Sequence, residues 1–220
     1  MTTFGISAYL KLVSLAPNAQ KSEINKRLSP KDSPYDYHRR LKQLIRQLTN
    51  NRRTLPEILT DILTIKNPPE RQSATDGIKK LVEWRKSNPG RISQTNSAIY
   101  RSPNQIFSVN FTPDFLIDLA GENVAVHVWN TKKPRLDLRM SFGALSLFRA
   151  LYANREDPPH DLAILNLRDS TLHRLAGVAD HSAIGLSTVA SVESIFQQII
   201  ADSRSGISRT EHPQAPSIPL

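Results

Sequence analysis

The sequence predicts a mixed α/β protein in which helices come first and a sheet follows. Up to Gly90, apolar residues recur at the spacing of helix faces. After Gly90 they recur at every second position, the spacing of strands with one buried face. A further helix is predicted over 141–153, between two strands, and a crossover helix of this kind joins parallel strands. A mixed sheet is therefore expected.

Helices account for the first region. Two are expected near 3–14 and 20–28. A third is indicated by an apolar stripe at helical spacing, formed by Tyr37, Leu41, Leu44, Ile45 and Leu48. The pattern Thr54-Leu55-Pro56-Glu57 is a capping box that begins a fourth helix. A fifth begins near Pro68 and ends at Asn88-Pro89-Gly90. We therefore expect residues 1–88 to be entirely helical.

Strands and helices alternate in the second region. A strand over 106–111 leads into a hairpin, and the nearly unbroken apolar run over 162–167 is typical of a strand buried on both faces. Another strand over 171–175 and a helix over 191–202 follow. We expect 106–167 to form one mixed sheet. The chain then divides into a helical basic region, an α/β core and a disordered tail rich in Ser, Gly and Pro, over 1–92, 93–202 and 203–220.

The predicted hairpin over 114–129 is the most informative stretch. Its apolar face is formed by Phe115, Ile117, Leu119, Val124, Val126 and Val128. The opposite face gathers Asp114, Asp118, His127 and Trp129. A two-residue loop between Ala120 and Asn123 sets Asp114 opposite Trp129. We expect the apolar face to be buried, and the other face to carry any chemistry.

The net charge of +9 is concentrated in the first region. Residues 1–92 contain 18 Lys and Arg against 8 Asp and Glu, whereas residues 93–220 contain 11 against 12. This asymmetry indicates a polyanionic partner, with DNA as the expected nucleic acid, although solvation of helix surfaces is an equal alternative. The expected contacts are Arg39, Arg40, Arg46, Arg52, Arg53, Lys132 and Arg135.

Several classes of protein are excluded by composition. The absence of cysteine excludes a disulfide scaffold and a thiol nucleophile. No Gly-rich phosphate loop and no HExxH motif occur. We find no run long enough to span a bilayer and no basic residue ahead of the apolar N-terminus, so no membrane partner is expected. The bacterial cytoplasm is the default location.

The order Pro113-Asp114, strand, Gly-containing turn, strand, helix and buried strand resembles the core of the PD-(D/E)XK nuclease-like superfamily, over roughly 95–170. The resemblance implies a restriction-endonuclease-like αβββαβ core in which Asp114 holds a divalent metal, Mg²⁺ or Mn²⁺. It also implies a second acid and a lysine on the next strand. This chain has His127 and Trp129 at those positions, which leaves His127 as a metal ligand and Lys133 as the candidate lysine.

Three functions follow. The first is a nucleic-acid-binding protein with a nuclease-like core whose active site is degenerate. The second is a working metal-dependent endonuclease or exonuclease, with Asp114, His127 and Lys133 as catalytic residues and with Asp114 and His127 as metal ligands. The third is a non-enzymatic protein-interaction module that uses the helical half. We favour the first, because His127 and Trp129 replace the second acid and the lysine.

Overall fold

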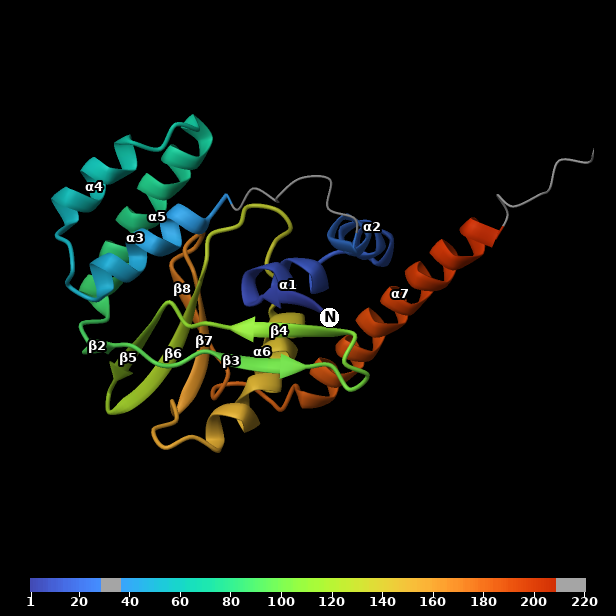
Figure 1. Cartoon of the computed structure of the whole chain (residues 1–220). Coiled ribbons are helices and arrows are strands. Elements are labelled where there is room, and N and C mark those ends of the chain that lie inside the picture. The colour runs from blue at the N-terminus through green and yellow to red at the C-terminus, as the bar shows by residue number, and fades with distance from the viewer. Residues whose placement is uncertain (29–36, 209–220) are drawn as a thin grey trace, which may run out of the picture.

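The computed structural model describes residues 1–28 and 37–208, with side chains up to residue 203 (Figure 1). The helices are α1 (Ile6–Val13), α2 (Pro17–Leu28), α3 (Arg39–Thr49), α4 (Leu55–Leu63), α5 (Pro68–Ser87), α6 (Leu138–Ala153) and α7 (Ser182–Ser208). The strands are β1 (Thr2–Gly5), β2 (Ile92–Ser93), β3 (Ala98–Arg101), β4 (Phe107–Phe111), β5 (Phe115–Leu119), β6 (Glu122–Trp129), β7 (Asp161–Asn166) and β8 (Thr171–Arg174). Within the described ranges this is a mixed α/β protein with seven helices and two mixed sheets.

The strands form a five-stranded sheet, in the order β2-β5-β6-β7-β8, and a three-stranded sheet, in the order β1-β4-β3. In the larger sheet only β6 and β7 are parallel, and α6 is the crossover between them. The prediction of one sheet over 106–167 is wrong, because β4 belongs to the smaller sheet. Pro113 separates β4 from β5, and a residue without an N–H cannot continue the ladder.

The prediction that 1–88 is entirely helical is also wrong. β1 lies at the N-terminus and runs parallel to β4, with Thr2 paired to Phe107. Its residues Thr2, Thr3 and Phe4 are of types that favour strands. The chain leaves the sheet after Gly5 and enters α1, so the first helix begins three residues later than expected.

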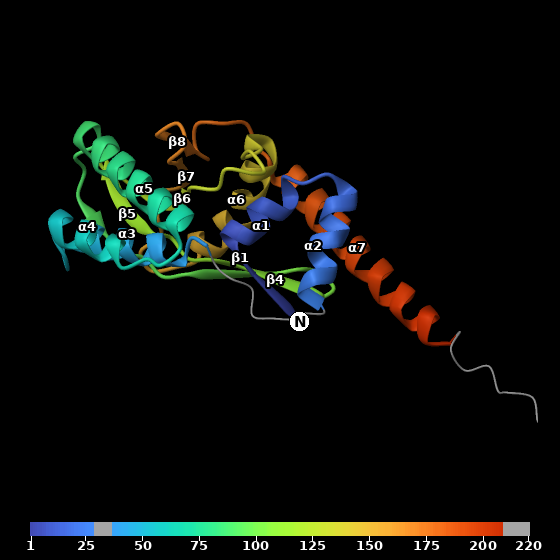
Figure 2. The ribbon, with the colours of Figure 1, turned by 90° about the horizontal axis from the view of Figure 1, so that it is seen from above.

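Two helical layers cover the larger sheet (Figures 1 and 2). Its predicted apolar face packs against α3, α4 and α5, and Phe115, Ile117, Val126 and Val128 are buried as expected. The opposite face carries Trp129, which packs with residues of α1, α6 and α7. Trp129 is 1% exposed, so it is a core residue and not a platform for bases.

The capping box at the start of α4 is confirmed. The Glu57 carboxylate accepts hydrogen bonds from the Thr54 backbone N–H at 2.7 Å and from the Thr54 hydroxyl at 2.8 Å. These contacts satisfy groups that a helix N-terminus leaves unpaired. The box fixes the start of α4 at Leu55.

The last helix is longer than the sequence indicates. α7 continues through 203–208, which were expected to be part of a disordered tail; residues 209–220 lie outside the described residues. By length and composition alone, Ser182–Ser203 could span a membrane, contrary to the expectation that no such run exists. One face of α7 lies in the same core as α1 and α6, through Val189, Val192, Phe196 and Ile199.

The hairpin has a different register from the expected one, and the observed register brings Asp114 close to His127. Ala120 and Gly121 form the turn, both with positive φ, and Leu119 pairs with Glu122. A turn with two positive φ values favours Gly at its second central position, whereas the expected loop would have put Glu122 there. Phe115 consequently pairs with Val126. Directly before this pair, the Asp114 N–H donates to the Val126 carbonyl, which brings the Asp114 carboxylate beside His127.

Candidate nucleic-acid interface

Asp114 is fully buried at the start of β5. Its backbone N–H donates to the Val126 carbonyl at 2.8 Å, and its Oδ2 accepts from the Val128 N–H at 2.8 Å. Its Oδ1 lies 3.7 Å from the Arg46 guanidinium. Oδ1 itself has no hydrogen-bond partner among the described residues. Asp114 is therefore a buried carboxylate that is only partly satisfied.

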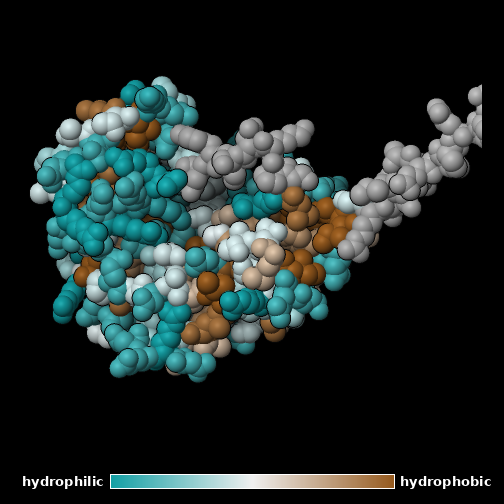
Figure 3. All heavy atoms as spheres, in the orientation of Figure 1, coloured by the Kyte–Doolittle hydropathy of each residue, from teal (hydrophilic) through white to brown (hydrophobic). Residues whose placement is uncertain are grey.

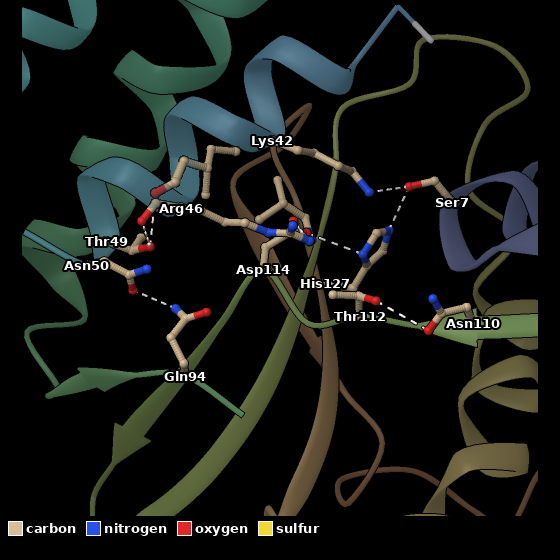
Figure 4. A network of polar contacts seen from close by, with 12 residues as sticks. Ser7, Lys42, Arg46, Thr49, Asn50, Gln94, Asn110, Thr112, Asp114 and His127 are labelled. Atoms are coloured by element: carbon tan, nitrogen blue, oxygen red, sulfur yellow. Dashed lines mark hydrogen bonds and ion pairs between the residues drawn. The ribbon is translucent and has the colours of Figure 1, made fainter. Parts of the chain in front are cut away.

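His127 links this carboxylate to α1 (Figure 4). Its Nδ1 lies 3.3 Å from Asp114 Oδ2, without hydrogen-bond geometry, and its Nε2 lies 2.9 Å from Ser7 Oγ. Lys42 of α3 donates to the same Ser7 Oγ at 2.6 Å. The hydroxyl proton of Ser7 is then best directed at Nε2. With the hydroxyl proton in that direction, the neutral imidazole carries its own proton on Nδ1, on the side of the carboxylate.

The protonation states follow from burial and charge. Burial alone would raise the pKa of Asp114, but the Lys42 ammonium, His127 and the Val128 N–H lower that pKa to about 2. Burial lowers the pKa of His127 to about 4, assisted by the charge of Lys42. At neutral pH the site therefore contains an ionised Asp114 and a neutral His127.

The order Asp114, His127, Ser7 is that of a relay for a serine nucleophile, but the surroundings do not suit that chemistry. The cavity lined by Ser7, Lys42 and Thr131 has a volume of about 10 Å³. That volume is enough for about one water and leaves no room for a substrate. The depressed pKa of His127 also makes it a poor base. The chain of contacts instead holds Lys42 close to Asp114.

The site does not fit a divalent metal. Among the described residues, no three His, Cys, Asp or Glu side chains are grouped closely enough to hold one. Mg²⁺ and Mn²⁺ require several oxygen ligands, whereas here Lys42 and Arg46 direct positive charge at Asp114, the one carboxylate that the described residues bring to this site. Asp118 lies at the far end of β5, where its Oδ1 accepts from the Gly121 N–H at 2.7 Å and holds the turn.

A basic hollow of about 560 Å³ runs along α3, beside Asp114. Its lining residues are Arg39, Lys42, Gln43, Arg46, Gln47, Asn50 and Arg52. We call it the α3 groove. Within the described part of the chain no carboxylate lines it, and the surface over α3–α5 in Figure 3 is mostly hydrophilic. Lys42 and Arg46 join the groove to Asp114, because each lines the groove and acts on that carboxylate.

The seven basic residues expected to contact nucleic acid have different surroundings. Arg39, Arg46 and Arg52 line the α3 groove. Arg40 and Arg53 instead form ion pairs with Asp61 of α4, the former at 2.9 Å. The loop that follows β6 exposes Lys132 and Arg135, together with the candidate catalytic residue Lys133.

The contacts found for Asp114 in the described part of the chain do not include Lys133. Its positive neighbours come from α3 instead. The sequence reasoning missed Lys42, although its position four residues before Arg46 placed both on one face of α3. It also missed Ser7, for which no sequence signal pointed to His127.

Comparison with known proteins identifies no family. No family model matches the sequence, and no curated protein matches it. Among solved structures, the chain is similar to one titled "Crystal structure of SSO0001", with 9% sequence identity, 83% of this chain and 84% of that chain covered, and a TM-score of 0.33. A likeness at this level carries no conclusion about function.

Proposed function

We propose that this protein binds nucleic acid, with DNA as the expected partner, along the α3 groove, and that its restriction-endonuclease-like core has a degenerate active site. One observation carries the proposal. The described residues that line the groove are the cationic side chains Arg39, Lys42, Arg46 and Arg52 and amide side chains, with no carboxylate among these described residues. Cations bind the phosphate backbone, and amides add hydrogen bonds to phosphates or bases.

The arrangement around Asp114 supports the nuclease-like part of the proposal. Asp114 follows Pro113 at the start of β5, β6 returns antiparallel to it, and α6 crosses to the parallel strand β7. His127 lies where the superfamily pattern has its second acid, and Trp129 lies in the core where the pattern has its lysine. Both replacements remove groups that Mg²⁺-dependent phosphodiester cleavage needs.

The strength of binding should depend steeply on salt. The three arginines that line the groove, Arg39, Arg46 and Arg52, would neutralise about three phosphates. The logarithm of the binding constant should then fall with the logarithm of the salt concentration with a slope of about −3. Fluorescence anisotropy of a labelled duplex, titrated at several salt concentrations, measures this slope.

A pair of charge reversals tests where binding occurs. Arg39→Glu with Arg52→Glu should abolish binding, since both side chains are exposed and line the groove. Lys66→Glu with Lys79→Glu makes the same change in net charge away from the groove and should weaken binding only slightly. Equal losses in the two double variants, or no binding at low salt by the unaltered protein, would refute the proposal.

One observation favours the interaction-module alternative. A second hollow, of about 620 Å³, lies on the other side of the end of α3. Its apolar lining includes Leu48, Leu55, Leu81, Val82 and Ile92. A partially exposed apolar hollow suits a protein segment. If the groove variants leave nucleic-acid binding unchanged, the alternative is tested with Val82→Trp, which would fill this hollow. The binding of protein partners is then compared between this variant and the unaltered protein.

A further inference from the structure

The apolar hollow of about 620 Å³ at the start of β2, which we call the β2 hollow, also carries positive charge. Arg85 and Arg91 belong to its lining, and no carboxylate does so in the part of the chain that the structure describes. Neither arginine forms an ion pair with another described residue. Arg85 is partly buried, and burial lowers the pKa of its guanidinium. A partly buried cation without an acid beside it favours an anionic ligand.

The β2 hollow also adjoins an unpaired edge of the larger sheet. β2 is the end strand of that sheet, so β5 pairs with one side of it (Figure 1). The Arg91 carbonyl accepts from the Asp118 N–H at 2.9 Å, in register with the pair of Ile92 and Ile117. Successive residues of an antiparallel strand direct their backbone groups to opposite sides. The N–H and C=O of Ile92, which lines the hollow, therefore point away from β5, where no described strand pairs with them.

An extended segment of another protein suits both features. A strand that adds to a sheet edge gains main-chain hydrogen bonds, and its alternate side chains enter the pockets beside that edge. Here the pocket is apolar, with arginines in the same lining, so the segment should combine apolar residues with Asp or Glu. A nucleic acid suits the hollow less well, because no aromatic side chain for stacking of bases occurs among its described lining residues.

We propose that the β2 hollow binds an extended acidic segment of a partner protein, which adds to β2 at Ile92, inserts apolar side chains against Leu48 and Val82, and places a carboxylate on Arg85. This inference extends the interaction-module alternative and does not rest on nucleic-acid binding. The described linings of the β2 hollow and of the α3 groove share no residue. The protein can therefore hold a nucleic acid and a protein partner at the same time.

The first test selects the partner chemistry. The unaltered protein is used to screen a displayed library of random peptides, and the bound peptides are sequenced. We expect peptides in which apolar residues alternate with Asp or Glu. Replacing these acids by Asn and Gln in a selected peptide should weaken binding about tenfold, as measured by fluorescence anisotropy. Recovery of no peptide, or of peptides without acidic residues, would overturn the inference.

The second test locates the selected peptide on the protein. Val82→Trp fills the hollow and should abolish binding. Arg85→Met with Arg91→Met should weaken binding about tenfold and remove the preference for the acidic over the neutralised peptide. The matched control is Arg39→Met with Arg52→Met, which removes the same charge from the α3 groove and should leave peptide binding unchanged. Binding that survives Val82→Trp, or equal losses in the two double variants, would contradict the proposal. A thermal melt of each variant confirms folding.

The third test examines the sheet edge and needs no variant. Hydrogen exchange of the Ile92 amide, followed by NMR in the unaltered protein, should slow when the peptide is added. The Ser93 amide is the internal control, because it already faces β5 and its exchange should change little. Unchanged exchange at Ile92 would exclude strand addition. Duplex DNA is titrated against Val82→Trp in parallel, and it should bind as it does to the unaltered protein. Absence of DNA binding with peptide binding intact would refute the proposed function alone.

Discussion

Two buried carboxylates in the larger sheet, Asp114 and Asp161, are satisfied to different degrees. Asp161 begins β7, and its carboxylate accepts from Arg174 Nε at 2.8 Å, from the Leu162 N–H at 2.8 Å and from the Ala176 N–H at 2.9 Å. Asp114 has one backbone hydrogen bond, a His127 nitrogen at 3.3 Å and a guanidinium at 3.7 Å. One carboxylate is fully hydrogen-bonded, and the other is held mainly by charge.

The difference indicates different roles. A buried charge with all its hydrogen bonds made contributes to the fold and has nothing left for a ligand. In Asp114, one carboxylate oxygen has no hydrogen bond from the described residues, and the neighbouring cations line an open groove. These cations can therefore still interact with a bound partner. Asp161 is therefore expected to matter for stability, and Asp114 for binding.

The largest effect is expected from Asp161→Ala, which leaves the N–H groups of Leu162 and Ala176 without their acceptor and removes one of the two acids that pair with Arg174. Since each buried donor left unsatisfied costs about 1–3 kcal/mol, the total loss of unfolding free energy should be about 3–5 kcal/mol, which urea denaturation measures. Glu122→Ala is the matched control, because Glu122 pairs with the same Arg174 but is 54% exposed, and it should cost less than about 1 kcal/mol. Similar losses of unfolding free energy from Asp161→Ala and Glu122→Ala would show that Asp161 contributes no more to stability than a surface ion pair does.

The next effect concerns pH. The pKa of His127 is about 4 in the folded protein, against 6.5 as its ordinary value, so the unfolded chain takes up this proton first. Stability is then fully present above pH 6.5 and falls as the pH drops toward 4, by about 3 kcal/mol. Asp114, with its pKa lowered from 3.8 to about 2, adds a loss only below that window. Urea titrations from pH 7.5 to 4 follow the effect, and His127→Gln should flatten it.

The smallest effect tests whether the contacts around Asp114 contribute little to the free energy of unfolding. Ser7→Ala removes the hydroxyl shared by His127 and Lys42 and should cost about 1 kcal/mol, since each hydrogen bond contributes little net free energy. Thr60→Ala, which removes an exposed hydroxyl bonded within its own helix, should change stability by less than about 0.5 kcal/mol. A loss of unfolding free energy from Ser7→Ala as large as that from Asp161→Ala would show that the surroundings of the two carboxylates stabilise the fold equally.

Local patterns in the sequence predicted much of the fold. The stripe of α3, the capping box at Thr54, the crossover helix α6 and the buried run of β7 all occur near their expected positions. The errors involve partners distant in sequence. The pairing of β1 with β4 and the transfer of β4 to a second sheet depend on contacts that no local spacing encodes.

Like the fold, the site was predicted only where local patterns in the sequence determine it. The two-residue periodicity placed Asp114 and His127 on one face, and the structure confirms that they adjoin. The register was wrong by two residues, a shift that leaves the two faces of the hairpin unchanged, because the turn is placed where its residues can adopt positive φ and the hydrophobic pattern does not encode this. Lys42 and Ser7 come from helices that precede the hairpin, so only the tertiary packing brings them to His127.

The pairing of β1 with β4 also has a consequence for the order in which parts of the chain can fold. Thr3 Oγ1 lies 2.9 Å from Ser108 Oγ, 105 positions further along the chain. Closing so long a segment is entropically costly and slow, whereas α3, α4 and α5 contact one another within one continuous stretch. As the chain leaves the ribosome, the layer that carries the α3 groove can form before β1 has a strand to join. Ser7, directly after β1, then completes the surroundings of His127 only when the N-terminus docks.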